Sequence, residues 1–276
     1  YAQELKENTY NLTRMNLVMR GILPDNIVTR NGDTLKSDWP WFDTDETKDE
    51  TYEPLFVDAV VSNPPYSQNW EPPEPGEDIR FEYGIAPKSK ADYAFLLHDL
   101  YHLRDDGIMT IVLPHGVLFR GAAEGRIRKQ LLQENLLSAV IGLPEKLFFG
   151  TGIPAAILVF QKRKSDENVL FIDASRDFRP GKNQNQLMPE NIERIVSTFT
   201  ARQPVDKYAA LVPIADILSE HDGNLNIPRY VDTFEEEEEI DLLAVRAERR
   251  KLDAELATLE TQMAAYLKEL GYDEEA

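Results

Sequence analysis

The feature that most constrains the fold is a succession of short apolar stretches, rich in Val, Ile and Leu, that alternates with helical stretches. The apolar stretches are residues 56–61, 108–113, 137–143, 155–160 and 169–173. Helical patterns fill residues 92–103 and 125–135 between them. Strands separated by helices of about 10 to 15 residues are typical of a mostly parallel, doubly wound sheet. The sequence therefore predicts an α/β fold, with residues 56–61 as one of its buried parallel strands.

Two segments before this pattern complete the N-terminal part. Residues 4–19 place Leu5, Leu12 and Met15 close to one face of a helix, and Gly21 ends that helix. The pattern of residues 27–35 predicts a short strand followed by a turn.

The last segment differs in character. Residues 235–270 contain no Gly or Pro, and their apolar residues recur mainly every three or four positions. This pattern predicts one amphipathic helix of about 35 residues and roughly 50 Å. A stripe on so long a helix normally faces a partner helix. We therefore expect a globular domain over residues 1–222, a linker over 223–234 and an association helix over 235–276.

Charge and composition narrow the functional class. The 276 residues have a net charge of −19 and include no Cys, which excludes disulfides and thiolate metal sites. Residues 232–276 alone hold 15 acidic and 5 basic residues. DNA affinity comes largely from Lys and Arg on phosphates, so a partner would have to supply much of the positive surface if this protein acts on DNA. The absence of Cys, of a secretory signal and of a membrane-length apolar run favours a cytoplasmic protein.

A short motif follows the stretch at residues 56–61 and carries the chemistry. It consists of Asn63, Pro64, Pro65 and Tyr66. The exocyclic amine of adenine is a poor nucleophile, because its lone pair is delocalised into the ring. An Asn oxygen and the next carbonyl can accept both amine hydrogens, while prolines keep these acceptors in place and an aromatic ring stacks on a flipped base. The motif therefore indicates transfer of a methyl group to an amine, although Pro-Pro could also simply end a strand.

Two acids upstream fit the same site. Glu4 stands before the first helix, where an acid after a sheet strand would bind ribose hydroxyls. Asp33 lies at a second expected strand end and could accept a hydrogen bond from the adenine amine of a cofactor. Each acid could equally be a helix-cap or turn residue, so their assignment depends on Asn63 downstream.

Longer runs point to a particular family. They are residues 3–4, 10–12, 15–17, 32–35, 62–66, 91–95, 113–120, 123–125, 150–154 and 224–228. With these runs the sequence resembles the modification (M) subunit of type I restriction-modification systems across essentially its whole length. The motif at 63–66 alone is compatible with many families of amino-methyltransferases, and the later runs favour the type I subunit.

The resemblance implies an activity and a set of partners. The activity is transfer of a methyl group from S-adenosylmethionine to adenine N6 in double-stranded DNA, within a bipartite site. The partners are a specificity subunit, a second M subunit and restriction subunits, and the long C-terminal helix corresponds to the region that packs against the specificity subunit. The catalytic motif of the family maps onto Asn63, Pro64, Pro65 and Tyr66, and its cofactor contacts map onto Glu4, Asp33 and Asn63.

One departure concerns the cofactor half of the site. In this family a Gly-rich loop follows the first strand of a Rossmann-like sheet, and both would lie before Tyr1. We therefore expect a sheet that lacks a strand near its centre. As a hypothesis, the chain is an N-terminally truncated M subunit that by itself binds S-adenosylmethionine weakly or not at all.

Two other functions remain open. A protein-glutamine or RNA amino-methyltransferase can use the same Asn-Pro-Pro-Tyr chemistry on another amide or amine. A non-catalytic assembly module would use only the long helix. The sequence does not identify a DNA target, because in type I systems the specificity subunit reads the bases.

Structural roles explain the remaining polar residues at least as well as catalytic or binding roles do. We expect His115 to be structural or close to the target, and His98 and His102 to pack or face solvent, because no third metal ligand is evident. We interpret residues 150–154 as a loop and residues 235–239 as the solvated start of the last helix. The basic cluster of Arg120, Arg126, Arg128 and Lys129 could face DNA phosphates or belong to a solvated helix.

Overall fold

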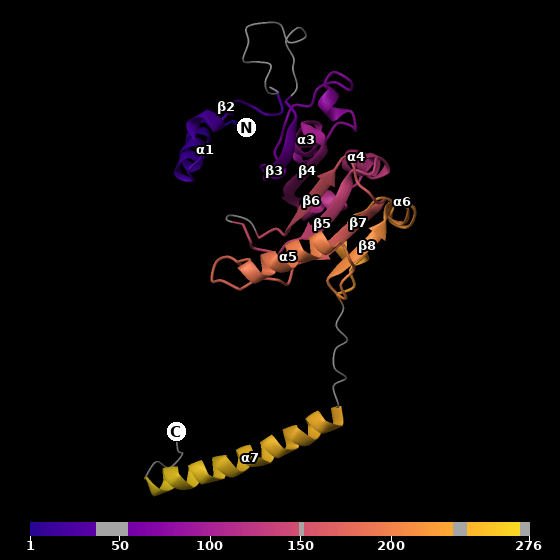
Figure 1. The fold of residues 1–276 in the computed structure, drawn as a ribbon. Helices are drawn as coiled ribbons and strands as arrows, with labels where there is room; N and C mark the ends of the chain where they lie inside the picture. The colour runs from indigo at the N-terminus through magenta and orange to yellow at the C-terminus, as the bar shows by residue number, and fades with distance from the viewer. Residues whose placement is uncertain (37–54, 149–151, 234–241, 271–276) are drawn as a thin grey trace. The chain divides into compact units, whose positions relative to one another are not determined.

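The computed structural model describes residues 1–36, 55–148, 152–233 and 242–270 of the chain (Figure 1). The chain divides into two compact units, Tyr1–Thr233 and Phe234–Ala276. The strands of the first unit are β1 (Ala2–Glu4), β2 (Thr29–Asn31), β3 (Val57–Ser62), β4 (Leu103–Pro114), β5 (Leu137–Gly142), β6 (Ala155–Gln161), β7 (Asn168–Asp173) and β8 (Ala209–Pro213). Its α-helices are α1 (Glu7–Met19), α3 (Asp92–Tyr101), α4 (Ala122–Gln133), α5 (Pro189–Ala201) and α6 (Ile214–His221), and its 3-10 turns are η1 (Pro24–Asn26), η3 (Ile79–Phe81), η4 (His115–Leu118) and η5 (Ile227–Arg229).

A six-stranded sheet forms the centre of the first unit, with the strand order β3-β4-β6-β5-β7-β8 (Figure 1). Strands β3, β4, β5 and β7 run in one direction, and β6 and β8 run against it. The predicted α/β fold class is therefore confirmed. The sequence predicts a strand at residues 155–160 but not its direction. This strand, β6, lies between β4 and β5 and is antiparallel to both.

Helices cover both faces of this sheet. On one face, Leu96 of α3 and Ile127 of α4 belong to the larger core cluster. On the other face, Ile195 of α5 packs in a second cluster. β5 contributes to both clusters, because alternate residues of a strand point to opposite faces. All six residues of β5 are buried, which accounts for the continuous apolar run in its sequence.

The stretch expected to be a buried parallel strand is parallel but not buried. β3 pairs with β4 in parallel register, with Val60 opposite Met109. It lies at the edge of the six-stranded sheet, and Val61 is 90% exposed. The prediction of burial was wrong because an edge position removes one neighbour, whatever the apolar content of the strand.

A second, smaller sheet lies at the N-terminus. β1 and β2 pair in parallel, with Glu4 opposite Asn31. Glu4 therefore ends a strand and precedes α1, in agreement with its expected place before the first helix. α1 connects the two strands, and none of its residues is buried. From the sequence we expected one sheet that lacks a strand near its centre. The described strands instead form two separate sheets.

The expected C-terminal helix is present as α7 (Leu242–Glu269), which forms the described part of the second unit. Residues 235–239, expected to open this helix, lie outside the described residues. Among the described residues, no helix is long and apolar enough to cross a membrane. From the segment at residues 223–234, expected to be a linker, Leu225, Ile227 and Val231 belong to the larger core cluster of the first unit.

Candidate active site

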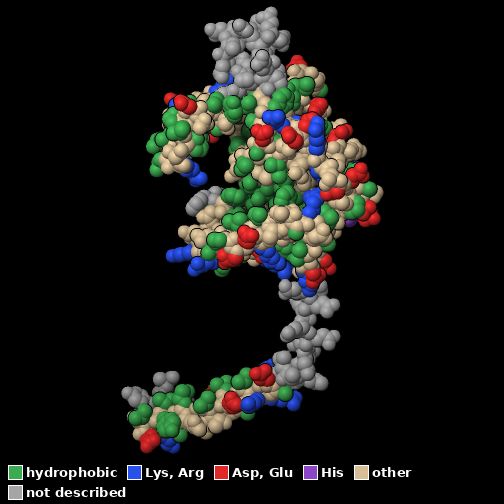
Figure 2. Space-filling view, in the orientation of Figure 1, with side chains coloured by type: hydrophobic (Ala, Val, Ile, Leu, Met, Phe, Trp, Pro, Cys, Tyr) green, Lys and Arg blue, Asp and Glu red, His purple; other side chains and the backbone are tan. Residues whose placement is uncertain are grey.

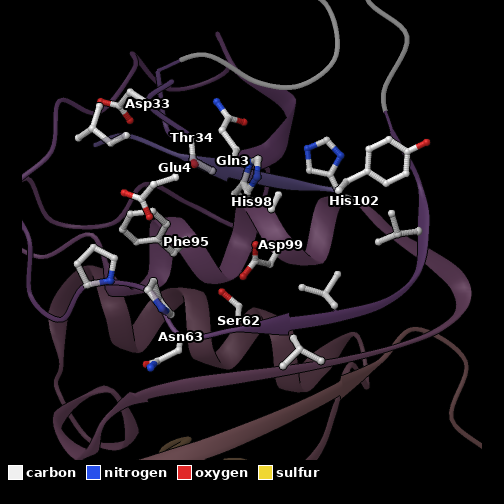
Figure 3. A pocket seen from close by; sticks show the side chains of 18 of the residues that line it. Gln3, Glu4, Asp33, Thr34, Ser62, Asn63, Phe95, His98, Asp99 and His102 are labelled. Carbon is white, nitrogen blue, oxygen red and sulfur yellow. The ribbon is translucent and has the colours of Figure 1, made fainter. Parts of the chain in front are cut away.

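A cavity of about 710 Å³ lies where β1, the turn after β2, the end of β3 and α3 meet (Figure 3). Its polar and aromatic lining comprises Tyr1, Gln3, Glu4, Lys6, Thr9, Asp33, Thr34, Ser62, Asn63, Gln68, Phe95, His98, Asp99 and His102. Pockets of about 300 to 1,000 Å³ are typical of sites for small molecules and cofactors. The cavity runs along β3, from Leu55 before the strand to the 63–66 loop after it. Its loop end lies at the carboxyl end of β3, the position at which open α/β sheets bind ligands.

The 63–66 loop forms one wall of this cavity. Asn63, Pro64 and Pro65 line it, whereas Tyr66 is not among the lining residues. The Tyr66 hydroxyl donates a hydrogen bond to Asn63 Oδ1 at 3.3 Å, and its ring lies edge-on to Phe148 with centroids 6.4 Å apart. Burial, and to a lesser degree the charge of Asp92, raises the pKa of Tyr66. The phenol therefore stays neutral, and it fixes the orientation of the Asn63 amide.

The two predicted acids line the opposite part of the cavity (Figure 3). Glu4 Oε1 accepts a hydrogen bond from the backbone N–H of Lys6 at 3.1 Å. Asp33 Oδ1 accepts one from the backbone N–H of Leu35 at 3.0 Å. Each carboxylate is thus oriented by its own backbone turn. The structure brings Glu4, Asp33 and Asn63 into one cavity, although 59 positions separate the first from the last.

Sequence reasoning missed Arg80, which ties the acid-bearing turn to the rest of the unit. This residue is 4% exposed. Its guanidinium donates to the carbonyls of Thr34 and Leu35, each at 3.0 Å, and contacts His98 Nδ1 at 3.0 Å. Asp78 holds the other side of the guanidinium through both carboxylate oxygens, at 2.6 to 3.1 Å. The signal in the sequence was an Asp-x-Arg pair inside a segment that looked like a polar, proline-rich loop.

His98 of α3 and His102, which directly follows that helix, pack inside the unit and line the cavity. His98 accepts from Arg80 through Nδ1, so its neutral ring carries a proton on Nε2. His102 Nδ1 lies 2.6 Å from the carbonyl oxygen of Leu55, and the two rings meet edge-on at 4.7 Å. Within the described part of the chain, no group of three or more His, Cys, Asp or Glu residues could hold a metal ion.

The basic cluster is divided between buried and exposed positions. Arg128 is 4% exposed and donates to the carbonyls of Gly223, Val117 and Arg120. Arg120 pairs with Asp92 and Glu124, and only 18% of its side chain is exposed. For these two residues both expectations, a DNA-facing surface and a solvated helix, were wrong. Arg126 is exposed, and Lys129 pairs with Asp222.

Two other predicted positions lie near β4 and β6. His115 begins η4, and its backbone N–H donates to the carbonyl of Pro154 at 3.1 Å. Burial lowers the pKa of His115, which favours a neutral imidazole. Gly150 and Thr151 lie outside the described residues, so the expectation for this loop stays a prediction.

Comparison with known proteins adds the family. A model of the N-6 DNA methylase family matches residues 1–239. This chain belongs to the N-6 DNA methylase family. The methylase subunit of the type I restriction enzyme MpnII from Mycoplasma pneumoniae is 35% identical over 280 residues, which cover 99% of this chain and 50% of that protein. The MjaVII methylase subunit from Methanocaldococcus jannaschii is 30% identical and covers 97% of this chain and 46% of that protein. The N-6 DNA methylase chain therefore spans about half the length of the curated relatives it matches.

Solved structures agree with this assignment. The methyltransferase subunit of a type I restriction-modification system from Streptococcus thermophilus is 49% identical, with a TM-score of 0.77 over 83% of this chain and 48% of that chain. The M protein of the type I restriction enzyme EcoKI is 20% identical, with a TM-score of 0.62 over 99% of this chain and 60% of that one, and it supports the fold alone. The resemblance to type I modification subunits that the sequence indicated is confirmed.

Proposed function

We propose that this N-6 DNA methylase chain is part of an adenine-N6 DNA methyltransferase, the modification subunit of a type I restriction-modification complex. The observation that carries the proposal is the meeting of Glu4 and Asp33 with Asn63, Pro64 and Pro65 around one cavity. A cofactor with a ribose and an adenine needs acceptors at one end of a site, and an amine substrate needs acceptors at the other.

The residues present fit S-adenosylmethionine, which when bound supplies a methyl group on a positively charged sulfur. Glu4 would hold the ribose hydroxyls, and Asp33 would accept from the adenine amine of the cofactor. Asp99 contributes a carboxylate to the same cavity, and its Oδ2 is buried without a hydrogen-bond partner among the described residues. A concave site with several acceptors and an unused buried oxygen suits a ligand rich in N–H and O–H donors and carrying positive charge.

The 63–66 loop would act on the target base. Asn63 Oδ1 and the Pro64 carbonyl accept the two hydrogens of the amine, which turns its lone pair out of the ring. The prolines limit rotation of these acceptors, so little entropy is lost when the base arrives. Tyr66 would stack on a base flipped out of the duplex. Because the Tyr66 hydroxyl also bonds to Asn63 Oδ1, the same residue orients the acceptor before the base binds.

α7 is the proposed association surface. Leu252, Leu256, Leu259, Met263 and Tyr266 are all more than half exposed and alternate in spacings of four and three residues. This is the a/d pattern of a coiled coil, which needs a partner helix. We infer that the partner is the specificity subunit, in a complex with a second M subunit and restriction subunits. Leu256→Lys would then prevent co-purification of the specificity subunit, whereas Glu255→Lys on the same helix would not.

The function is tested with the full-length protein expressed together with the other subunits of its system. Host DNA is digested and its N6-methyladenine measured by mass spectrometry, for wild type, Asn63→Ala and the exposed control Asp106→Asn. The proposal expects methylation with wild type and the control, and none with Asn63→Ala. Methylation that persists with Asn63→Ala would refute it.

The alternatives have separate outcomes. If DNA is unmodified, transfer of labelled methyl groups to release-factor protein or to RNA is measured instead. Labelling of either substrate would support a protein-glutamine or RNA amino-methyltransferase. A complex that assembles but transfers no methyl group to any of these substrates would identify a non-catalytic assembly module.

A further inference from the structure

Two carboxylates of α3 lie at the two ends of the 63–66 loop. The loop is flanked by Ser62 at the end of β3 and by Ser67 on the other side. The Ser62 side chain points toward the carboxyl group of Asp99 (Figure 3), and its hydrogen bond acts to lower the pKa of Asp99. Ser67 donates its backbone N–H to Asp92 Oδ1 at 2.6 Å. Asp92 and Asp99 are seven residues apart, about two helical turns, and therefore lie on the same face of α3.

Neither carboxylate is a routine surface residue. Asp92 is fully buried, and it also accepts from Arg120 Nη2 at 3.0 Å through Oδ2. Arg120 in turn pairs with Glu124 of α4 at 3.0 Å. The Ser67 end of the loop is therefore joined to α4 through Asp92 and Arg120. Ser67 has a φ of +50°, a strained backbone for a residue with a side chain, and the bond to Asp92 holds it there. Asp92 is buried and Asp99 is half-buried. Acids in such positions are uncommon in an apolar helix, and each of these two lies against a residue next to the loop.

We propose that Asp92 and Asp99 form a clamp that holds the 63–66 loop at both ends, and that both are positioning residues for methyl transfer. This inference rests on the proposed function of the loop. The clamp acts on Asn63 through the backbone: Asp99 fixes Ser62, the residue before Asn63, and Asp92 fixes Ser67, the residue after Tyr66. Correct placement of acceptors on a reacting amine is worth about 100-fold in rate for a displacement of about 1 Å.

The two ends of the clamp differ in charge environment. Asp92 lies in the first turn of α3, where the helix dipole favours a carboxylate, and it has a guanidinium partner. Asp99 lies in the last turn, where the dipole disfavours negative charge. Burial raises the pKa of Asp99 to about 6, against the opposing effects of the Ser62 hydrogen bond and the charge of His102. The other titratable groups that line this cavity are Tyr1, Glu4 at the end of β1, Lys6 before α1, Asp33 after β2, and His98 of α3.

This difference predicts a pH dependence of methyl transfer. Above about pH 6 the Asp99 carboxylate is ionised and accepts a charge-assisted hydrogen bond from the Ser62 hydroxyl. Below that pH the acid is protonated and the bond weakens. The single-turnover rate of the wild type should therefore rise with pH through a limb near pH 6.

The experiment uses the complete modification enzyme, assembled from the full-length protein and its partner subunits. Single-turnover methyl transfer to duplex DNA is measured from pH 5 to 8, together with the dissociation constants for S-adenosylmethionine and DNA. The variants are Ser62→Ala, Asp99→Asn, their combination, and Asp92→Asn, with the exposed Asp106→Asn as the matched control. We expect a loss of roughly 10- to 100-fold in the single-turnover rate at saturating S-adenosylmethionine for each clamp variant. The dissociation constant for DNA should stay unchanged in every variant, and that for S-adenosylmethionine should stay unchanged in Ser62→Ala and Asp92→Asn, whose side chains are not assigned to the cofactor. Asp99→Asn should also lose the limb near pH 6.

Two further readouts separate positioning from general stability. If Ser62 and Asp99 act as one unit, the double variant is no slower than the slower single variant. Hydrogen exchange of the Ser67 amide should quicken in Asp92→Asn, whether or not the protein transfers methyl groups. The clamp is refuted if rates stay at the wild-type level, or if rate, both affinities and unfolding midpoint all fall together. Full transfer with Asn63→Ala would instead refute the proposed function, and the Ser67 exchange would still report on the clamp.

Discussion

The six-stranded sheet and the β1–β2 sheet are stabilised in different ways, although both contribute residues to the same cavity. β5 and β7 are packed between helices, and Leu170 and Phe171 of β7 are fully buried. β1 and β2 are three residues each, and the helix that joins them buries none of its side chains. The loop that would act on the base is therefore attached to a self-sufficient core. The acids that would hold the cofactor depend on a few specific contacts with that core.

The largest expected effect lies in the core of the larger sheet. Phe171→Ala removes a fully buried ring that stacks on Tyr230 with centroids 4.0 Å apart. Urea unfolding should show a loss of about 3 to 5 kcal/mol. The matching change on α1 is Leu12→Ala, because Leu12 is 56% exposed, and it should cost about 0.5 kcal/mol or less. Equal losses for the two variants would contradict the contrast between the regions.

The second effect concerns the link between the two regions. Arg80→Met removes the guanidinium that binds the Thr34 and Leu35 carbonyls and leaves Asp78 without its charge partner. We expect a loss of about 3 kcal/mol in the free energy of unfolding, since breaking a buried pair strands the other charge. Hydrogen exchange should quicken more in β1 and β2 than in β5. Arg104→Met, at a side chain that is 54% exposed, is the control and should change neither.

Comparison of these predictions with the sequence shows what the residues alone could reveal. The strands at residues 137–143 and 169–173 could be predicted because their apolar runs are buried on both faces. The run at residues 108–113 could be predicted because its residues are alternately half-buried and buried. The exposure of Val61 could not, because the same run suits a central or an edge strand. β8 and α6 were not predicted.

The candidate site shows the same limit. Asn63 and its neighbours could be found from their chemistry, since few other sequences place two acceptors and an aromatic ring after a strand. Arg80 and Arg128 resemble ordinary surface residues in the sequence, and only the fold shows that carbonyls from distant segments surround them. Asp92 and Asp99 did carry a signal, because each is an acid within an otherwise apolar helix.

The smallest expected effect comes from breaking a surface ion pair, that of Arg202 with Asp166. Arg202 binds both oxygens of Asp166 at 2.8 and 3.0 Å, and this hydrogen bonding lowers the pKa of Asp166 to about 2. Because the folded-state pKa lies below the ordinary value of 3.8, the pair stabilises the protein above that pH and loses its effect as the pH falls toward 2. Asp166→Asn should therefore cost about 1 kcal/mol or less at pH 7, since the pair is solvated. The difference from wild type should vanish near pH 2, and a difference that persists there would show that the charge is not responsible.

The most direct test of the account is to separate cofactor binding from methyl transfer in the full-length, assembled enzyme. Calorimetry gives the dissociation constant for S-adenosylmethionine, and single-turnover transfer to DNA is measured at saturating cofactor. The account predicts that Glu4→Gln and Asp33→Asn each weaken binding by roughly 10-fold or more and keep the rate at saturation. Asn63→Ala should abolish transfer even at saturation. Unchanged affinity in both acid variants, or a rate that saturating cofactor restores in Asn63→Ala, would contradict the claim that one cavity joins the cofactor acids to the 63–66 loop.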